Sequence, residues 1–384
     1  MRIAIVCDSV NLQYAGSLVS TWRYATKLAK KGHNVVLIST GKKSSVKIVD
    51  GVKIIRFKAW TIPGTDLDFW MSLYVSPKKI RKILKEEHIQ LVHCMIPTPL
   101  CLLVSKVAKK LDIPLIAHSH TQPENILMSM KMNNRLLNKL FYKYLVQFYS
   151  MADVIVCPTR FAKEKLQMHG LKNKTIVISN GVDLDKFKIN RIPKSFFRAF
   201  GLNREKKHIL FVGRLWREKN IATLIKAMPY VLKRFPLTHL DIVGKKSNQY
   251  FKLKKLVDKF DISDNVTFLG KINDKDLVYA YNTCDIFCLP SYVELEGMVV
   301  LEAMACGKPI IISNSSESAS KYYVDGNGYI FDADDPKDLS KKVIRILSDD
   351  KLKEKMMARS LKIVKELDIN NSIKKLEKLY AQCI

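Results

Sequence analysis

The segment 285–312 constrains the fold of this chain more than any other. Residues 285–289 form an apolar run that predicts a buried strand, and a polar loop with Gly297 follows it. The next run, MVVLEAMA, predicts a short helix that ends at Gly307 and Pro309, because glycine can terminate a helix and proline cannot extend one. Residues 310–312 predict a second buried strand. Strand, loop, helix and strand form a βαβ unit, which binds ligands at the carboxyl end of its strands.

Two carboxylates bracket the turn of this unit. Glu294 lies in the loop, and Glu302 lies about one turn into the predicted helix. The N–H groups of Gly297, Met298 and Val299 should point out of the helix start, where the helix dipole and unpaired donors favour a phosphate. The segment therefore predicts an anion site flanked by two acids that could bind hydroxyl groups.

The same alternation of strand and helix runs through both halves of the chain. In the first half, residues 3–7 and 35–39 predict strands around a helix over 17–31. The second half restarts the pattern with a strand over 208–212 and a helix over 221–235. Each half should therefore be a parallel sheet with helices on both faces. Residues 183–205 contain Pro193, show no clear periodicity and are predicted to link the halves.

Several kinds of site are not supported by the sequence. The opening strand and helix carry no GxGxxG, and Gly307-Lys308 lacks the other residues of a Walker phosphate loop. No group of His and acidic residues has metal-ligand spacing, so no metal is expected. The eight cysteines include no CxxC pair, and most lie in apolar runs. They should therefore be buried, reduced thiols in a cytoplasmic protein.

The balance of charge points to an anionic partner. The 65 Lys and Arg residues against 36 acids give a net charge of +29. Nucleic acid, a membrane surface or a phosphorylated substrate would fit, and so would a general demand for solubility. No nucleic acid is expected, because basic residues are not interleaved with a platform of stacking aromatics. No apolar run is long enough to span a membrane, and the N-terminus does not resemble a signal peptide.

Two basic, amphipathic segments lie in the first half. Ser76-Pro77 should begin a helix in which Lys78, Lys79, Arg81 and Lys82 surround apolar positions. A second helical pattern covers 125–149, with Lys and Arg among Met, Leu, Phe and Tyr. Each segment could lie on an anionic bilayer, where a basic residue contributes about 1 kcal/mol. A solvated helix face is the alternative for both.

The motifs, taken together, resemble the family 4 glycosyltransferases of the GT-B fold, which are retaining enzymes with nucleotide-sugar donors. The resemblance covers nearly the whole chain in the right order. It rests on the opening strand and glycine loop, SNGVD at 179–183, FVGRLWREKN at 211–220, and Glu294-x7-Glu302 within PSYVELEGMVVLEAMACGKP. It implies two Rossmann-like parallel-sheet domains that face each other across a cleft.

The resemblance also implies roles for individual residues. Arg214 and Lys219 match the basic pair that holds the donor diphosphate and stabilises its charge as it leaves. Glu302 matches the glutamate that binds the ribose, and Glu294 matches the one near the transferred sugar. The alternatives are surface salt bridges for the basic pair and a helix-dipole contact for Glu302. The family has no settled covalent nucleophile, and the basic pair would replace a divalent ion.

The implied roles in the first half are less specific. Gly16 matches a loop glycine that lets the backbone approach the donor phosphate, and His120 matches a histidine that faces the donor sugar. His118 would share its strand face and is the lesser candidate, although two structural histidines would also fit. Gln122 and Glu124 lie where the acceptor would approach.

One departure from the family pattern concerns the donor loop. Many members have phenylalanine before the loop glycine, whereas this chain has Glu296, which puts the sugar specificity in question. Base recognition in such folds is largely by backbone, here near Gly270 and Lys271.

The predicted organisation is an acceptor domain over 1–183, a nucleotide-sugar domain over 184–365 and a helix over 366–384 that packs back toward the first domain. The predicted activity is hexosyl transfer to a membrane lipid or lipid-linked acceptor at the cytoplasmic face of the membrane. UDP-glucose is the first choice of donor and GDP-mannose the second, and no cofactor is expected. The alternatives are a soluble transferase that makes polysaccharide or small glycosides, and a non-catalytic protein that binds nucleotide or nucleic acid.

Overall fold

The chain forms two compact units, each built around one sheet. The computed structural model describes residues 1–8, 16–61, 70–71, 75–130, 132 and 134–384. The first unit comprises Met1–Pro123, Asn134–Asn180 and Asn370–Ile384, and the second comprises Glu124–Asn133 and Gly181–Ile369. The chain therefore passes between the units on either side of the segment 124–133, after Asn180 and after Ile369, where the sequence suggested boundaries after residues 183 and 365.

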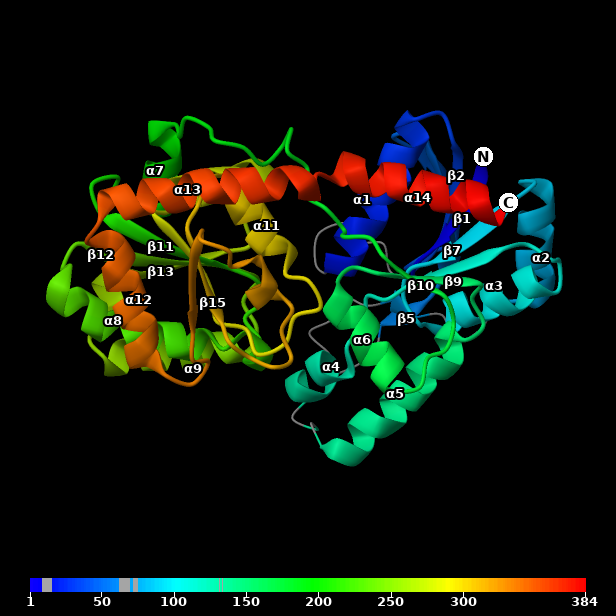
Figure 1. Ribbon diagram of the computed structural model, residues 1–384. Coiled ribbons are helices and arrows are strands. Elements are labelled where there is room, and N and C mark those ends of the chain that lie inside the picture. Colours follow the sequence, from blue (N-terminus) through cyan, green and yellow to red (C-terminus); the bar gives the residue numbers. More distant parts are fainter. Residues whose placement is uncertain (9–15, 62–69, 72–74, 131, 133) are drawn as a thin grey trace. The chain divides into compact units, whose positions relative to one another are not determined.

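The first unit has an eight-stranded sheet in the order β10-β9-β8-β7-β1-β2-β4-β3 (Figure 1). Its strands are β1 (Arg2–Val6), β2 (Asn34–Gly41), β3 (Ser45–Val49), β4 (Val52–Lys58), β7 (Leu91–Cys94), β8 (Leu115–His118), β9 (Val154–Cys157) and β10 (Thr175–Val177). Its helices are α1 (Gly16–Lys30), α2 (Pro77–Glu86), α3 (Pro99–Lys109), α5 (Arg135–Tyr149), α6 (Arg160–Met168) and α14 (Ile369–Cys383). A two-stranded piece pairs β5 (Trp60–Thr61) with β6 (Trp70–Met71).

The second unit has a six-stranded, wholly parallel sheet in the order β13-β12-β11-β14-β15-β16. Its strands are β11 (Lys207–Val212), β12 (Thr238–Val243), β13 (Val266–Gly270), β14 (Ile286–Leu289), β15 (Ile310–Ser313) and β16 (Gly328–Phe331). Its helices are α4 (Pro123–Ser129), α7 (Lys194–Phe200), α8 (Ile221–Arg234), α9 (Asn248–Lys259), α10 (Asp274–Thr283), α11 (Met298–Ala305), α12 (Pro336–Leu347) and α13 (Asp350–Val364). Short 3-10 turns are η1 (Arg217–Lys219), η2 (Ser263–Asn265), η3 (Ser320–Tyr323) and η4 (Lys365–Leu367).

The apolar runs of the sequence form the interior of each unit, as their lengths predict. Every residue of β14 and β15 is buried, because helices cover both faces of a parallel sheet. In α14, Ile373, Leu376 and Tyr380 are fully buried, and the helix packs on the first unit. In Figure 1 this red helix lies beside the blue and cyan strands of the first unit.

Four local expectations are corrected by the structure. The pattern over 125–149 is two helices and not one, because the Asn134 side chain accepts a hydrogen bond from the Leu137 amide and begins α5 afresh. The linker over 183–205 contains α7. The sheet of the first unit is not entirely parallel, because β3 pairs antiparallel with β4 through a tight turn at Asp50 and Gly51, both at positive φ. Ser76 precedes α2, but its side chain makes no capping hydrogen bond.

Candidate active site

The strand order of the second unit reverses beside β11, and we call the carboxyl edge of the sheet at this point the crevice. The order turns back between β11 and β14, which pair directly, and this switch point is where open α/β sheets bind ligands. The loop that follows β11 carries Arg214 and Lys219, and the loop that follows β14 carries Glu294 and Gly297. The topology therefore brings together two motifs that lie 75 residues apart at Lys219 and Glu294.

Lys219 and Glu294 form the central ion pair of this crevice. Lys219 Nζ lies 2.7 Å from Glu294 Oε1, and the two side chains are 9% and 14% exposed. The backbone holds Glu294 in place, because its N–H donates to Glu317 O and its C=O accepts from the Ala319 amide. Breaking such a buried pair by removing one partner would leave the other charge without compensation, so each side chain supports the other.

Arg214 lies beside this pair and has three kinds of partner. Its guanidinium stacks on the Trp216 ring at 3.8 Å, and Nη2 lies 3.4 Å from Asn125 Oδ1 in α4. Nη2 also lies 3.8 Å from Glu218 Oε1. Burial lowers the pKa of Arg214, and the charges of Glu218 and Glu294 oppose that shift. Stacking on an aromatic ring, together with polar contacts at one end of the guanidinium, restricts the direction of the arginine side chain.

Glu218 belongs to the same cluster, although the sequence interpretation passed over it. Its side chain is completely buried, and neither carboxylate oxygen accepts a hydrogen bond from another described residue. Burial raises its pKa, while Lys219 and Arg214 lower it. The only available signal was its position between two residues of the motif, which does not separate a buried acid from an exposed one.

The helix that follows Glu294 begins as the sequence predicts. Gly297 precedes α11 at φ +85°, and a Cβ there would lie 2.2 Å from Ser320 Oγ, so glycine is required both for conformation and for space. Met298 and Val299 are the first helical residues, and amides at this position have no intrahelical acceptor. The helix start that the predicted anion site requires is therefore present, and binding of an anion there stays a prediction.

Glu302 is held by a residue that the motif does not contain. Tyr281 Oη, from α10, donates a hydrogen bond to Glu302 Oε2 at 3.0 Å, and the carboxylate residue is 6% exposed. Burial and the charge of Glu302 raise the pKa of Tyr281 well above its usual range, so the phenol remains a donor. The phenol fixes the carboxylate one turn inside the helix.

Glu296, the residue that departs from the family pattern, points into the interior of the protein. It is 3% exposed, and its carboxylate accepts a hydrogen bond from the Tyr323 phenol, whose pKa is raised by burial and by this acid. Its carbonyl accepts from Ser320 Oγ at 3.1 Å. Glu296 therefore anchors the loop to η3, and its side chain is occupied with that contact.

In the first unit, three histidine rings stack at the carboxyl edge of the sheet. His118 and His120 have ring centroids 4.1 Å apart at an angle of 5°, and His93 stacks on His118 at 5.4 Å. His118 is fully buried and His120 is partly exposed. Burial lowers the pKa of His93 and of His120 to about 3, and that of His118 well below its usual range. The rings are therefore neutral at pH 7.

The other predicted residues of the first half fall in several places. Gly16 is the first residue of α1, and the loop before it lies outside the described residues. Gln122 and Glu124 are buried, at 3% and 9% exposure. Lys78, Lys79, Arg81 and Lys82 are exposed on α2, as expected of a basic helix face.

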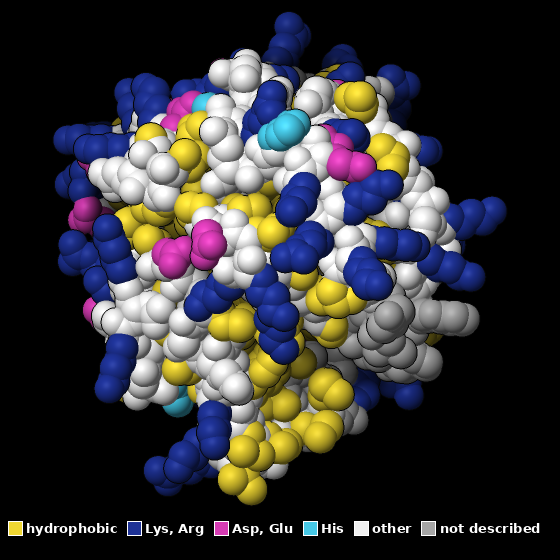
Figure 2. Space-filling view, turned by 90° about the vertical axis from the view of Figure 1, so that its right-hand side faces the viewer, with side chains coloured by type: hydrophobic (Ala, Val, Ile, Leu, Met, Phe, Trp, Pro, Cys, Tyr) yellow, Lys and Arg dark blue, Asp and Glu magenta, His cyan; other side chains and the backbone are white. Residues whose placement is uncertain are grey.

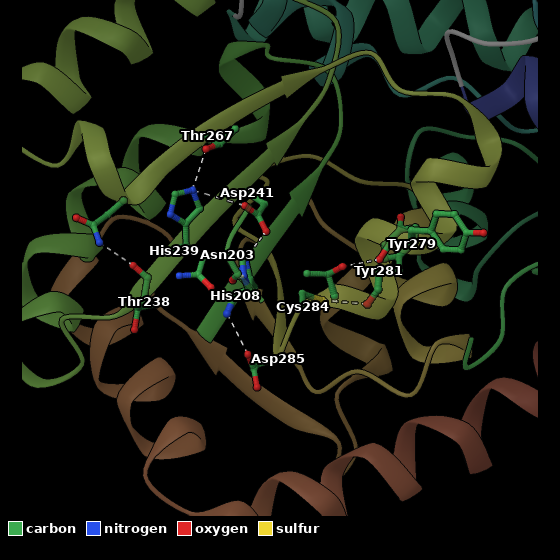
Figure 3. A network of polar contacts seen from close by, with 12 residues as sticks. Asn203, His208, Thr238, His239, Asp241, Thr267, Tyr279, Tyr281, Cys284 and Asp285 are labelled. Carbon is green, nitrogen blue, oxygen red and sulfur yellow. Dashed lines mark hydrogen bonds and ion pairs between the residues drawn. The ribbon is translucent and has the colours of Figure 1, made fainter. Parts of the chain in front are cut away.

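A second polar network in the second unit lies at the opposite end of the strands (Figure 3). His208 Nδ1 lies 2.8 Å from Asp241 Oδ2, and its Nε2 lies 2.8 Å from Asn203 O. His239 Nε2 lies 2.8 Å from Thr267 Oγ1. These residues stand near the amino ends of β11, β12 and β13, so they brace the sheet away from the crevice.

Two searches of the described residues give negative results. No three His, Cys, Asp or Glu side chains in the described ranges converge as metal ligands would. No helix in this part of the chain has the length and apolarity that a bilayer-spanning segment needs.

The chain matches two family models that together cover most of its length. Residues 14–186 match the model of Glycosyltransferase Family 4, and residues 194–362 match that of Glycosyl transferases group 1. An uncharacterised glycosyltransferase of Haemophilus influenzae is 31% identical over 293 residues, which is 76% of this chain and 75% of that protein. The protein is a family 4 glycosyltransferase. The family predicted from Arg214, Lys219, Glu294 and Glu302 is thereby confirmed, and so is the prediction of an enzyme.

Further comparisons place this glycosyltransferase among known relatives. It is similar to the alpha-monoglucosyldiacylglycerol synthase of Streptococcus pneumoniae, with 29% identity over 317 residues, or 81% of this chain and 70% of the relative. It shares its fold with HepE of Anabaena, solved with UDP and glucose, at a TM-score of 0.77 and 16% identity over 100% of both chains. The predicted GT-B fold, with two parallel-sheet α/β domains, is confirmed by this similarity.

Proposed function

We propose that this glycosyltransferase moves a hexosyl group from a nucleotide-diphosphate sugar to a hydroxyl of a membrane lipid or lipid-linked acceptor, with retention of anomeric configuration. UDP-glucose is the proposed first donor and GDP-mannose the second. The observation that carries the proposal is the crevice between β11 and β14, where Arg214 and Lys219 lie beside Glu218 and Glu294 and where the helix that contains Glu302 begins.

Each group in the crevice suits one part of a nucleotide sugar. Arg214 and Lys219 would bind the diphosphate together with the amides at the start of α11, as cations and helix starts favour anions. Glu302, oriented by Tyr281, would accept hydrogen bonds from the ribose diol. Glu294 would orient hydroxyls of the transferred sugar. A structural neighbour that contains UDP and glucose supports the choice of donor.

The proposed reaction breaks the bond between the anomeric carbon and the β-phosphate oxygen and forms a bond to the acceptor oxygen on the same face. The acceptor proton passes to the leaving phosphate. Negative charge grows on that phosphate, and Arg214 and Lys219 would stabilise it without a divalent ion. His120 would face the donor sugar as a neutral hydrogen-bonding group.

A screen of donors and acceptors with mass detection tests this assignment. UDP- and GDP-hexoses would be offered with diacylglycerol or phosphatidylinositol in vesicles, with and without EDTA. We expect transfer from one donor that survives EDTA and is lost in Arg214→Ala and Glu302→Ala. Transfer that stops with EDTA would contradict the metal-independent scheme, and no transfer from any donor would contradict the proposed function.

The first unit offers a surface suited to an anionic membrane. On α5 the apolar side chains Leu136, Leu140 and Tyr144 recur every four residues and are 67%, 54% and 37% exposed. The exposed cations Arg135, Lys139 and Lys143 run beside them at the same spacing. Figure 2 shows apolar side chains gathered at the lower edge of the face it presents, with Lys and Arg nearby. A stripe of this kind would insert its apolar side while its cations meet lipid phosphates.

The helix α2 differs from α5 in a way that changes its proposed role. Its apolar residues Ile80 and Leu84 are 0% and 1% exposed, so they belong to the core, and its solvent face is dominated by cations. We propose that α5 inserts into the membrane surface at the cytoplasmic face, and that α2 contributes electrostatic attraction alone.

Vesicle flotation separates these two contributions. Leu136→Ser with Leu140→Ser should weaken binding to phosphatidylglycerol vesicles about tenfold or more, since each leucine buries apolar area in the interface. The matched control is Phe251→Ser, which removes an apolar side chain that is 70% exposed in the second unit. Replacing Lys78, Lys79, Arg81 and Lys82 by Gln should weaken binding only at low salt. Unchanged binding of the leucine variant would exclude α5 as the inserting helix.

A soluble acceptor is the second candidate, because it needs the same crevice and no membrane. It would be a growing polysaccharide or a small glycoside. Transfer at full rate to such an acceptor without vesicles would favour it over the lipid.

A further inference from the structure

The stacked histidines of the first unit continue beyond the predicted site residues to the helix α14. His93 Nδ1 lies 2.6 Å from Tyr380 Oη. Tyr380 is fully buried, and burial holds the pKa of its phenol well above its usual range. The phenol and His93 Nδ1 share one hydrogen bond, and the tautomer of His93 decides which of the two atoms donates.

The stack connects this hydrogen bond to His120. His93 stacks on His118, and His118 stacks on His120 with nearly parallel rings. The Tyr24 ring lies against His118 at 5.7 Å, and the Tyr149 phenol donates to the His118 carbonyl at 3.4 Å. Within the described residues, neither nitrogen of His118 has a hydrogen-bond partner. The His118 ring is therefore positioned by packing, which includes its contacts with the rings of His93, Tyr24 and His120.

We propose that Tyr380, His93 and His118 are positioning residues that set the ring orientation of His120, so that a helix contributed by the far end of the chain tunes sugar transfer. The inference rests on the proposed function in one respect, the assignment of His120 to the donor sugar. None of the three touches the substrate in this scheme.

We call the series Tyr380, His93, His118 and His120 the relay. The helix α14 is anchored at several points, so it can hold the Tyr380 end of the relay in a fixed position. Glu377, on the same helix, lies 2.5 Å from Lys31 Nζ and 2.9 Å from His33 Nε2. Lys27 Nζ donates to Asn370 Oδ1 at 3.3 Å. With Ile373 and Leu376 also fully buried, the backbone that carries Tyr380 is held at several points. A fixed phenol can impose its orientation on His93, whereas a mobile one could not.

The test uses Tyr380→Phe, which removes one hydroxyl and keeps the ring. We expect kcat to fall about fivefold, as for the loss of one hydrogen bond in positioning, while the donor KM stays the same. In histidine-labelled protein, the 15N imidazole signals of His93 and His120 should both shift. Tyr142→Phe is the matched control, because Tyr142 also stacks on a histidine, His169, in the same unit at 3.6 Å but outside the relay.

A second variant keeps the proposal testable if the first effect is small. His93→Gln removes a ring from the stack, and its effect on kcat should not add to that of Tyr380→Phe, because both act through one contact. The relay would be overturned if Tyr380→Phe moved the His93 signals and left the His120 signals and kcat unchanged. If His120→Ala were fully active, the proposed role of His120 would fail, yet the imidazole signals would still decide whether the relay exists.

Discussion

The two units place different chemistry at the carboxyl edges of similar parallel sheets. The second unit gathers acidic and basic side chains there, and Lys219 and Glu294 form a pair at 2.7 Å. The first unit gathers three histidines, which burial makes neutral. The difference shows two ways to keep polar groups out of water: pairing preserves charge, and a lowered pKa removes it.

The largest expected effect comes from removing the cation Lys219, which should affect catalysis much more than stability. Lys219→Ala should reduce kcat/KM for transfer by about 100- to 1,000-fold, the range seen when one group that stabilises transition-state charge is lost. Glu294 would then lack its partner, so the melting temperature should fall only modestly. The control is Lys226→Ala, an exposed lysine of α8 in the same unit. Steady-state kinetics with the best donor measure the effect, and activity within threefold of wild type would refute the diphosphate role.

Lowering the pH should change the stability of the two units differently, because their histidines have different pKa shifts. A histidine whose folded pKa lies below its unfolded value of about 6.5 contributes stability that is lost as pH falls, and for His93 the loss between pH 7 and pH 5 is about 2 kcal/mol. Asp8 has the opposite effect on the stability of the first unit. Burial raises its pKa to about 6, so its protonation as pH falls removes the free-energy cost of a buried charge. The effect of His93, His118 and His120 together should exceed that of Asp8, so the first unit should lose stability as pH falls.

The second unit should respond to acid with a different sign. Burial alone would lower the pKa of His208, but Asp241 outweighs it and raises the pKa, so its contribution is present at low pH and is lost as pH rises. His239, with a pKa lowered by burial, acts against it. Hydrogen exchange with mass spectrometry at pH 7 and pH 5 should show β7 and β8 losing protection before β11 and β12. Equal loss of hydrogen-exchange protection in both units would contradict the predicted difference in their response to pH.

The ion pair of the second unit should also compete with the donor. Glu294→Gln removes the anion that holds Lys219, so UDP should bind up to about tenfold more tightly, in line with one charged hydrogen bond. Sugar transfer should fall at the same time, because the sugar loses its carboxylate. Calorimetric titration of UDP measures the first effect. Weaker UDP binding would mean that Glu294 does not compete with the diphosphate.

The smallest expected effect concerns the phenol behind Glu302. Tyr281→Phe keeps the buried ring and removes its hydrogen bond to the carboxylate, so UDP affinity should fall about three- to tenfold. Deoxyuridine diphosphate provides the control, since a ligand without the 2′-hydroxyl should be less sensitive to the change. An equal loss for both ligands would point to a general disturbance of α10.

The sequence was enough to predict the alternation of strands and helices, the two parallel-sheet domains and the loop that contains Glu294 and Gly297. These features depend on apolar runs and on residues such as glycine that act locally. The residues that support the site could not be found in this way. Tyr281 and Glu302 are 21 positions apart, and Tyr380 and His93 are 287 apart, so only the folded topology brings them together.

The inward turn of Glu296 shows the same limit in a single residue. A charged side chain in a polar loop gives no sign that it will be buried, and its partner Tyr323 lies in a turn with no distinctive pattern. The break between α4 and α5 was likewise hidden, because the capping side chain of Asn134 lies within an otherwise helical pattern.

The return of α14 to the first unit has a consequence for biosynthesis. The strands β1, β7 and β8 leave the ribosome early, but the helix that covers them emerges only after the whole second unit. Until then His93 lacks the Tyr380 phenol, and the sheet lacks one of its apolar covers. The second unit can therefore finish folding first, although most of its sequence is made later, and the first unit completes its packing only once α14 has been released.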